Sequence, residues 1–115
     1  MKKEKVMRKA EIKMHDFTAG WLTEDEHGYH FSYDQNYLNQ KGAKPVSLTM
    51  PVREKPFDSV MLFSFFDGLI PEGWLLDIVQ RNWKLDPRDR MGLLLACCKD
   101  CIGAVSVNPV NMEAV

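Results

Sequence analysis

Three cysteines lie close together near the end of the chain, at Cys97, Cys98 and Cys101. A structural zinc site takes four thiolate or imidazole ligands, most often from two separated pairs. Only three thiols are present, and all three histidines precede residue 31, so the spacing argues against a metal centre. An odd number of clustered cysteines is a poor disulfide framework, so we expect the thiols to be reduced. A thiol enzyme stays an alternative, although one lysine is the only visible feature that would lower a thiol pKa.

His15, Asp16 and Ser47 are the residue types of a hydrolase triad. Such a triad needs its nucleophile on an exposed, strained turn, and no G-x-S-x-G elbow surrounds Ser47. The sequence also contains no glycine-rich loop of the kind that cradles phosphates. The paired carboxylates Asp86 and Asp89 are interpreted as helix caps. We therefore expect no catalytic residues, no metal and no cofactor, and we expect that the protein is not an enzyme.

The densest apolar segment lies between Phe63 and Trp74, where six large apolar side chains fall within a short stretch. Most of them must be core, because a chain of this size has one small core to fill. Trp74 differs, since it follows Gly73 in the first turn of an expected helix. Tryptophan is the residue type most enriched among interface hot spots. From the residues alone, Trp74 fits an interface and the core equally well.

The chain has 115 residues, of which 45% are hydrophobic and 10% aromatic, with a formal net charge of −1. This suits one soluble domain and argues against disorder and against nucleic acid as the main ligand. Residues 1–13 carry a local charge of +4. We interpret them as a solvated arm leading into a strand, with contact to DNA or an acidic partner as the alternative. No apolar run reaches the roughly 20 residues of a membrane span, and no signal peptide is visible, so we expect a cytoplasmic protein.

Residues 9–33 alternate between apolar and polar side chains with the period of two that is typical of half-buried strands. His15-Asp16 predicts a tight turn, and Gly20 predicts a bulge in the returning strand. Gly28 is expected to supply the positive φ that closes a second hairpin. The third strand has one aromatic face, made by Tyr29, Phe31 and Tyr33. The pattern predicts a three-stranded antiparallel meander.

Asp34 predicts the cap of a short helix, and residues 46–50 alternate like a strand packed beside the meander. Residues 58–67 predict a helix that begins at Asp58 and is stopped by Gly68.

A second helix is expected over residues 71–84, and a third begins at Asp86-Pro87. The core stripe of that third helix is Met91, Leu94, Leu95 and Cys98. A short final strand is expected from Ala104 to Val107. The predicted fold class is α+β: a small antiparallel meander or partly open barrel, three helices after it and a short C-terminal strand.

Four segments in this order and spacing resemble the N-terminal domain of the HipA-like serine/threonine kinase toxins of bacterial toxin–antitoxin systems. The segments are Ser47–Pro51, Phe65–Gly73, Asp89–Ala96 and Lys99–Val105. The resemblance covers Arg8 to Pro109, which makes residues 1–7 a basic arm, residues 8–109 the domain and residues 110–115 a tail. The resemblance also accounts for Cys101 as a residue of the family's sequence pattern, which is a further argument against a metal site at the cysteines.

The resemblance implies a protein that binds other proteins. The nucleotide loop and the catalytic and metal-binding aspartates of such kinases cannot be located, so we expect no kinase activity. The chain begins with Met and stops just past the domain, like the small antitoxin of tripartite systems, whose kinase toxin lacks this domain. The resemblance therefore predicts an antitoxin that neutralises a HipA-like kinase toxin; a helix-turn-helix protein is a third member that binds the DNA. The alternative is an N-terminal scaffold domain excised from a full-length kinase toxin.

The expected partner-binding residues form the loop and helix start, with Trp74 directed toward the active-site cleft of the kinase. They are Leu69, Ile70, Pro71, Glu72, Gly73 and Trp74. No direct contact with nucleic acid or a membrane is expected.

Overall fold

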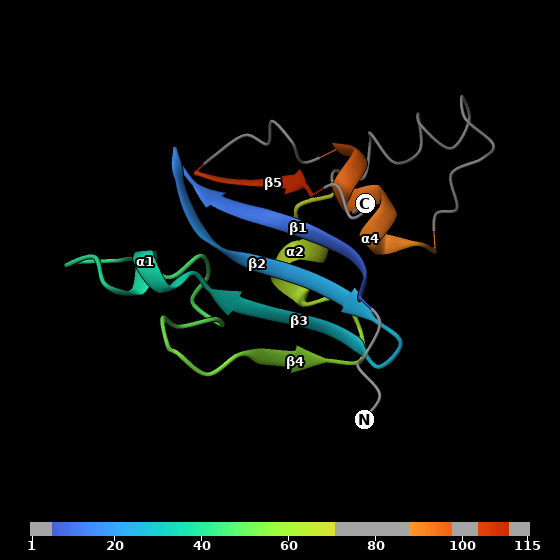
Figure 1. Ribbon diagram of the computed structural model, residues 1–115. Coiled ribbons are helices and arrows are strands. Elements are labelled where there is room, and N and C mark those ends of the chain that lie inside the picture. Colours follow the sequence, from blue (N-terminus) through green and yellow to red (C-terminus); the bar gives the residue numbers. More distant parts are fainter. Residues whose placement is uncertain (1–5, 71–87, 98–103, 111–115) are drawn as a thin grey trace.

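The computed structural model describes residues 6–70, 88–97 and 104–110 (Figure 1). The elements are β1 (Val6–Met14), β2 (Phe17–Asp25), β3 (Gly28–Tyr33), α1 (Gln35–Leu38), β4 (Phe57–Ser59), α2 (Ser64–Asp67), α4 (Arg90–Cys97) and β5 (Val105–Pro109). The strands form one open antiparallel sheet in the order β4-β3-β2-β1-β5. The predicted α+β class is confirmed.

The first two hairpins follow the turn residues of the sequence. His15 has a φ of 57° in the two-residue loop between β1 and β2, so the predicted tight turn is confirmed. The register of β1 against β2 shifts beside Gly20, which confirms the bulge. A Cβ atom at Gly20 would lie 2.5 Å from the carbonyl oxygen of Ser32 and 2.7 Å from the ring of Phe31. Glycine is needed here because the core aromatic lies directly against the backbone.

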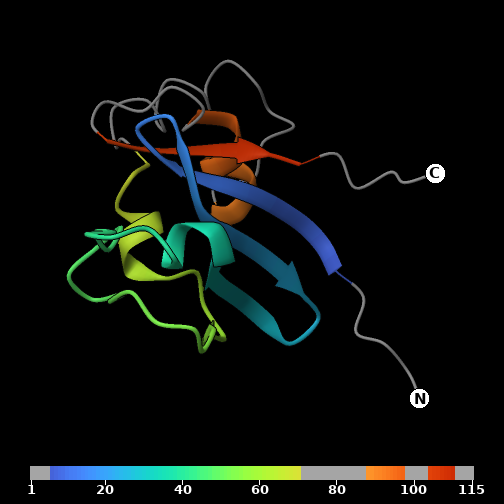
Figure 2. The ribbon, with the colours of Figure 1, turned by 60° about the vertical axis from the view of Figure 1, so that its left-hand side comes forward.

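The core lies between one face of the sheet and the helices α2 and α4, which two views show from different directions (Figure 1 and Figure 2). Alternate residues of the strands point into it, as the period of two predicts. Its largest fully buried side chains are Phe31, Phe66, Ile12, Leu22, Met91, Leu93, Leu94 and Val107. Phe31 packs edge-on against Tyr33, with ring centroids 4.9 Å apart. Of the aromatic face predicted for the third strand, Phe31 and Tyr33 are buried in the core, and Tyr29 is partly buried against it.

The predicted strand over residues 46–50 is wrong. Val46 and Met50 are buried, but the segment between them is a turn in which the Met50 amide donates to the Ser47 carbonyl at 3.0 Å. The Ser47 hydroxyl accepts a second hydrogen bond from the Thr49 amide at 3.2 Å. Such local side-chain bonds to the backbone compete with extended structure. The strand beside β3 is β4 instead.

The helix predicted over residues 58–67 is also partly wrong. Its first residues belong to β4, where Asp58 pairs with His30 of β3, and only Ser64–Asp67 form α2. Pairing with a neighbouring strand has overridden the local helical signal. Gly68 is the C-cap of α2, so the predicted stop is confirmed.

The last helix begins later than predicted. The Gly92 amide donates to the Asp89 side chain at 3.1 Å, which makes Asp89 the capping residue. Met91 and Leu94 are fully buried as expected, and Leu95 is partly buried against the core as expected; Leu93, which was not predicted, is also fully buried. The predicted short final strand is confirmed as β5. The expected helix over residues 71–84, the helix start at Asp86 and Cys98 lie outside the described residues.

His30 joins β4 to the hairpin of β2 and β3. Its Nδ1 lies 2.6 Å from Asp58 Oδ1, and its Nε2 lies 2.9 Å from Oδ2 of the buried Asp25. These hydrogen bonds, first that to Asp58, raise the pKa of His30 above its ordinary value. The reason is that only the imidazolium donates to both carboxylates at once.

We expect the stabilisation from His30 to be largest at mildly acidic pH. Because the pKa of His30 is raised in the folded state, its contribution is complete below the unfolded pKa of about 6.5 and is lost as pH rises through the folded pKa. Urea-unfolding midpoints of the wild type and His30→Gln should therefore converge as pH increases. Asp58→Asn should reduce the pH dependence of the wild type. Equal separation of the two midpoints at all pH values would contradict this prediction.

Candidate partner-binding surface

The segment from α2 to Ile70 is held firmly to the core. The Gly68 amide donates to the Ser64 carbonyl at 2.9 Å, and two further turns follow through Leu69 and Ile70. Phe66 is fully buried and Ile70 is 5% exposed. The chain is therefore hydrogen-bonded and packed up to the last described residue of this segment.

The structure describes two of the six residues predicted to bind a partner. Ile70 is buried in the core, and Leu69 is partly buried against it. The remaining four, Pro71, Glu72, Gly73 and Trp74, lie outside the described residues. Ile70 therefore fastens the beginning of the predicted binding segment to the domain.

An ion pair joins α2 to the start of α4. Arg90 Nε donates to Asp67 Oδ1 at 2.6 Å. These two residues flank the undescribed segment 71–87, so its two ends are attached to elements that are bonded to each other. Beside the ion pair is a hollow of about 440 Å³, lined by Met61, Leu62, Ser64, Asp67, Gly68 and Arg90.

Arg8 anchors the start of α4 to the sheet. Its Nη1 and Nη2 donate to the two carboxylate oxygens of Asp89 at 2.9 and 2.8 Å, and its Nε donates to Glu24 at 2.6 Å. These hydrogen bonds, the one to Asp89 above all, raise the pKa of Arg8, and the bond from Arg8 lowers the pKa of Asp89. Bidentate geometry fixes orientation as well as distance, so α4 is positioned rigidly on β1.

Several large apolar side chains are exposed among the residues that the structure describes. They are Met7, Phe17, Leu48, Val60 and Met61. Leu48, at 96% exposure, is the most exposed of the five. Sequence reasoning missed it because residues 46–50 were interpreted as a strand. The flanking prolines and the Ser-x-Thr spacing were the local signals for a turn.

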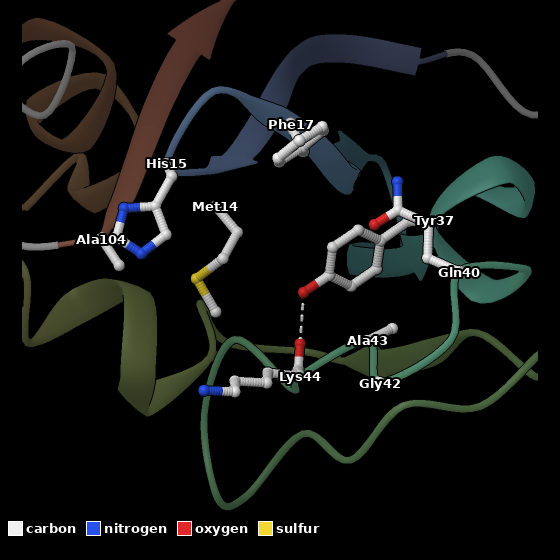
Figure 3. Close-up of a pocket in the computed structure, with 9 residues that line it drawn as sticks. All are labelled: Met14, His15, Phe17, Tyr37, Gln40, Gly42, Ala43, Lys44 and Ala104. Atoms are coloured by element: carbon white, nitrogen blue, oxygen red, sulfur yellow. Dashed lines mark hydrogen bonds between the residues drawn. The ribbon is translucent and has the colours of Figure 1, made fainter.

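A separate hollow of about 460 Å³ lies between the β1–β2 turn and the loop after α1 (Figure 3). Its lining residues are Met14, His15, Phe17, Tyr37, Gln40, Gly42, Ala43, Lys44 and Ala104. The Tyr37 hydroxyl donates to the Lys44 carbonyl, which closes the loop over α1. The ionisable side chains of this lining are His15, Tyr37 and Lys44.

No hydrogen bond joins the side chains of His15, Asp16 and Ser47. His15 and Asp16 form the β1–β2 turn, whereas the Ser47 hydroxyl lies 3.0 Å from the Thr49 hydroxyl. In the part of the chain that the structure describes, no group of three or more metal-ligating side chains gathers. Within the same ranges, no helix has the length and hydropathy that a membrane span requires.

Comparisons with known proteins relate this fold to one family. The HipA N-terminal domain family matches residues 10–108. A solved structure described as the N-terminal domain of HipA toxin superposes with a TM-score of 0.74 at 29% identity, and covers 98% of this chain and 100% of its own.

Two relatives differ in how much of their length is matched. A Haemophilus influenzae Rd protein described as uncharacterized is 34% identical over 102 residues, which are 89% of this chain and 92% of that protein. The Sinorhizobium fredii NGR234 protein named "Putative kinase Y4mE" is 29% identical over 98 residues. The match spans 84% of this chain but only 23% of that protein.

Proposed function

We propose that this chain, which belongs to the HipA N-terminal domain family, is a HipS-like antitoxin that binds and neutralises a HipA-like serine/threonine kinase lacking such a domain. One observation carries the proposal. The matched region is 92% of the Haemophilus relative but 23% of the kinase-named Sinorhizobium relative. The same domain thus occurs almost alone in one protein and as a small part of a longer chain in another.

A separate domain must replace a covalent tether with interface free energy. Specific interfaces bury about 1,200–2,000 Å² in total, and a few aromatic anchors supply most of the affinity. We assign the interface to the segment of Leu69, Ile70, Pro71, Glu72, Gly73 and Trp74, in which the buried Ile70 attaches the segment to the core and Trp74 is the anchor that enters the kinase active-site cleft. The proposal is supported by the buried Ile70 and by the Asp67–Arg90 ion pair, which attach the described residues on either side of segment 71–87 to the core and to each other.

Neutralisation would follow from occupying the domain-docking surface and obstructing the active site. Either exclusion of substrate or stabilisation of an inactive kinase state would produce it. In this proposal the chain has no kinase activity and no cofactor, acts in the cytoplasm, and makes no direct contact with nucleic acid or a membrane. A helix-turn-helix protein would complete a ternary complex and supply the contact with DNA.

The second candidate function is that of an N-terminal scaffold domain belonging to a full-length kinase toxin. The Sinorhizobium relative favours it, since the matched region there is part of a much longer chain. The domain would then dock onto its own kinase and onto a DNA-binding antitoxin. The reading frame beside the gene discriminates: a kinase frame that starts without this domain supports the separate antitoxin.

Co-expression with the neighbouring kinase tests the proposed function directly. We expect that the kinase alone arrests growth, that this chain restores growth, and that the two proteins co-purify. In the matched control, the kinase is co-expressed with the Phe31→Ala variant of this chain. This variant lacks a core aromatic side chain, so we expect no rescue of growth. Continued growth arrest with equal amounts of wild-type chain and kinase, and no co-purification, would contradict the proposal.

A further inference from the structure

The hollow between the β1–β2 turn and the loop after α1 is enclosed by residues from distant parts of the chain. Met14 and His15 lie on one side of it, and Tyr37 and Gln40 lie on the opposite side (Figure 3). Its volume of about 460 Å³ falls within the range of roughly 300–1,000 Å³ that is typical of sites for small molecules. The hollow is therefore large enough to take a small ligand.

Hydrogen bonds hold both sides of this hollow in place. The His15 amide donates to the Ala104 carbonyl at 2.6 Å, which ties the β1–β2 turn to the start of β5. On the other side, the Tyr37 hydroxyl donates to the Lys44 carbonyl, and the Gln40 amide donates to the Tyr37 carbonyl at 3.1 Å. Tyr37 is also buried in the core. Because the walls are bonded without a ligand, little conformational entropy remains to be lost on binding.

One part of the lining is apolar and partly uncovered. Phe17 is 59% exposed and does not belong to the core cluster, whereas Met14 is packed against that cluster. The ring of Tyr37 faces the hollow from the other side (Figure 3). Aromatic rings pack favourably against other rings, and a thioether makes favourable contacts with them. This part of the hollow therefore suits an aromatic ligand body.

The other part of the lining is cationic. Within the described residues, no hydrogen bond or ion pair engages the Lys44 ammonium or the His15 ring. None of the nine lining residues carries a carboxylate, and Asp16, which follows His15 in the turn, is not one of them. In the view of Figure 3 the Lys44 side chain extends toward the side formed by Met14 and His15. An ammonium and an imidazole N–H are donors that suit a carboxylate.

We propose that this hollow binds a small carboxylate with an aromatic body. The carboxylate pairs with the Lys44 ammonium and accepts from the His15 ring, and the aromatic body packs against Phe17 and Met14. Both parts of the ligand are needed, because a neutral ligand would gain no charge pairing from Lys44 and a bare anion would leave Phe17 uncovered. The site is independent of the proposed function, since every group that forms it belongs to this chain.

The test titrates the whole chain, without any partner, with hydrocinnamate and follows the amide resonances by NMR. We expect saturable shifts centred on the hollow, with a Kd of about 1 mM or below. Lys44→Met keeps an unbranched side chain but removes the charge, and should weaken binding about fivefold or more. Lys41→Met is the matched control, because Lys41 is exposed and does not line the hollow; it should change affinity less than about twofold.

Three further measurements separate this site from unspecific binding. Phe17→Ala should weaken binding while it keeps the urea-unfolding midpoint, because Phe17 lies outside the core. The neutral amide hydrocinnamide, and acetate, which lacks the aromatic body, should each bind about fivefold or more weakly than hydrocinnamate. The proposal is overturned if the wild type shows no saturable shifts at the hollow. Equal affinity for the amide, or equal losses for Lys44→Met and Lys41→Met, would overturn it as well.

Discussion

Trp74→Ala is expected to leave the domain folded and to weaken neutralisation of the kinase. Truncating a central tryptophan of an interface costs about 2 kcal/mol or more of binding free energy, which lowers affinity about thirtyfold. The segment that carries Trp74 also contains Ile70, which is packed into the core and 5% exposed. Because that attachment does not depend on the tryptophan, binding should be weakened without loss of the fold.

Two measurements separate binding from folding for Trp74. Affinity for the kinase is measured by calorimetry, and stability of the isolated chain by urea unfolding. Trp74→Phe is the matched control, since it keeps an aromatic ring and should retain part of the affinity. An unfolded Trp74→Ala domain would assign Trp74 to the core, and normal neutralisation by this variant would remove it from the interface.

Phe31→Ala is expected to have the largest effect on stability. Phe31 is fully buried, and its ring centroid lies 4.9 Å from that of Tyr33, 5.6 Å from Phe66 and 6.3 Å from Phe57. It also fills the space that the absent side chain of Gly20 leaves open. Removing a core phenylalanine costs about 3–5 kcal/mol. That is a large part of the roughly 5–15 kcal/mol that a whole domain has.

Phe17→Ala is the matched control for Phe31→Ala, because Phe17 is 59% exposed. Urea-unfolding midpoints should fall strongly for Phe31→Ala and change little for Phe17→Ala. Phe31→Leu should lie between them, since leucine fills part of the cavity. A loss of less than about 1 kcal/mol for Phe31→Ala would mean that the surrounding rings collapse into the space.

The meander was predictable from the sequence because its signals are local. Alternation of side chains sets the strand faces, and the turn at His15 and the bulge at Gly20 depend on neighbouring residues. The next segments were mispredicted because distant partners decide them. The Tyr33 hydroxyl closes the turn that contains Leu48, and His30 recruits Asp58 into β4. In short segments the intrinsic preference for helix or strand is too weak to outweigh such contacts.

The partner-binding role of residues 69–74 stays a prediction, because four of the six residues lie outside the described residues. The apolar residues Leu69 and Ile70 predict a packed segment before Pro71, and Ile70 is buried in the structure. The exposure of Leu48 was missed because the alternation of residues 46–50 outweighed the local signals for a turn. The hydrogen bonds of Tyr33, from a different part of the chain, add to the turn's own hydrogen bonds and could not be predicted from the segment itself.

The pairing of β5 with β1 has a consequence for synthesis of the protein. Ala10 pairs with Pro109, and Met14 pairs with Val105, so the sheet is completed only after residue 109 has left the ribosome. Until then β1 presents an unpaired edge, which is a template for aggregation. Copies of the chain that end before β5 should therefore keep this edge unpaired and aggregate more readily than copies that include β5.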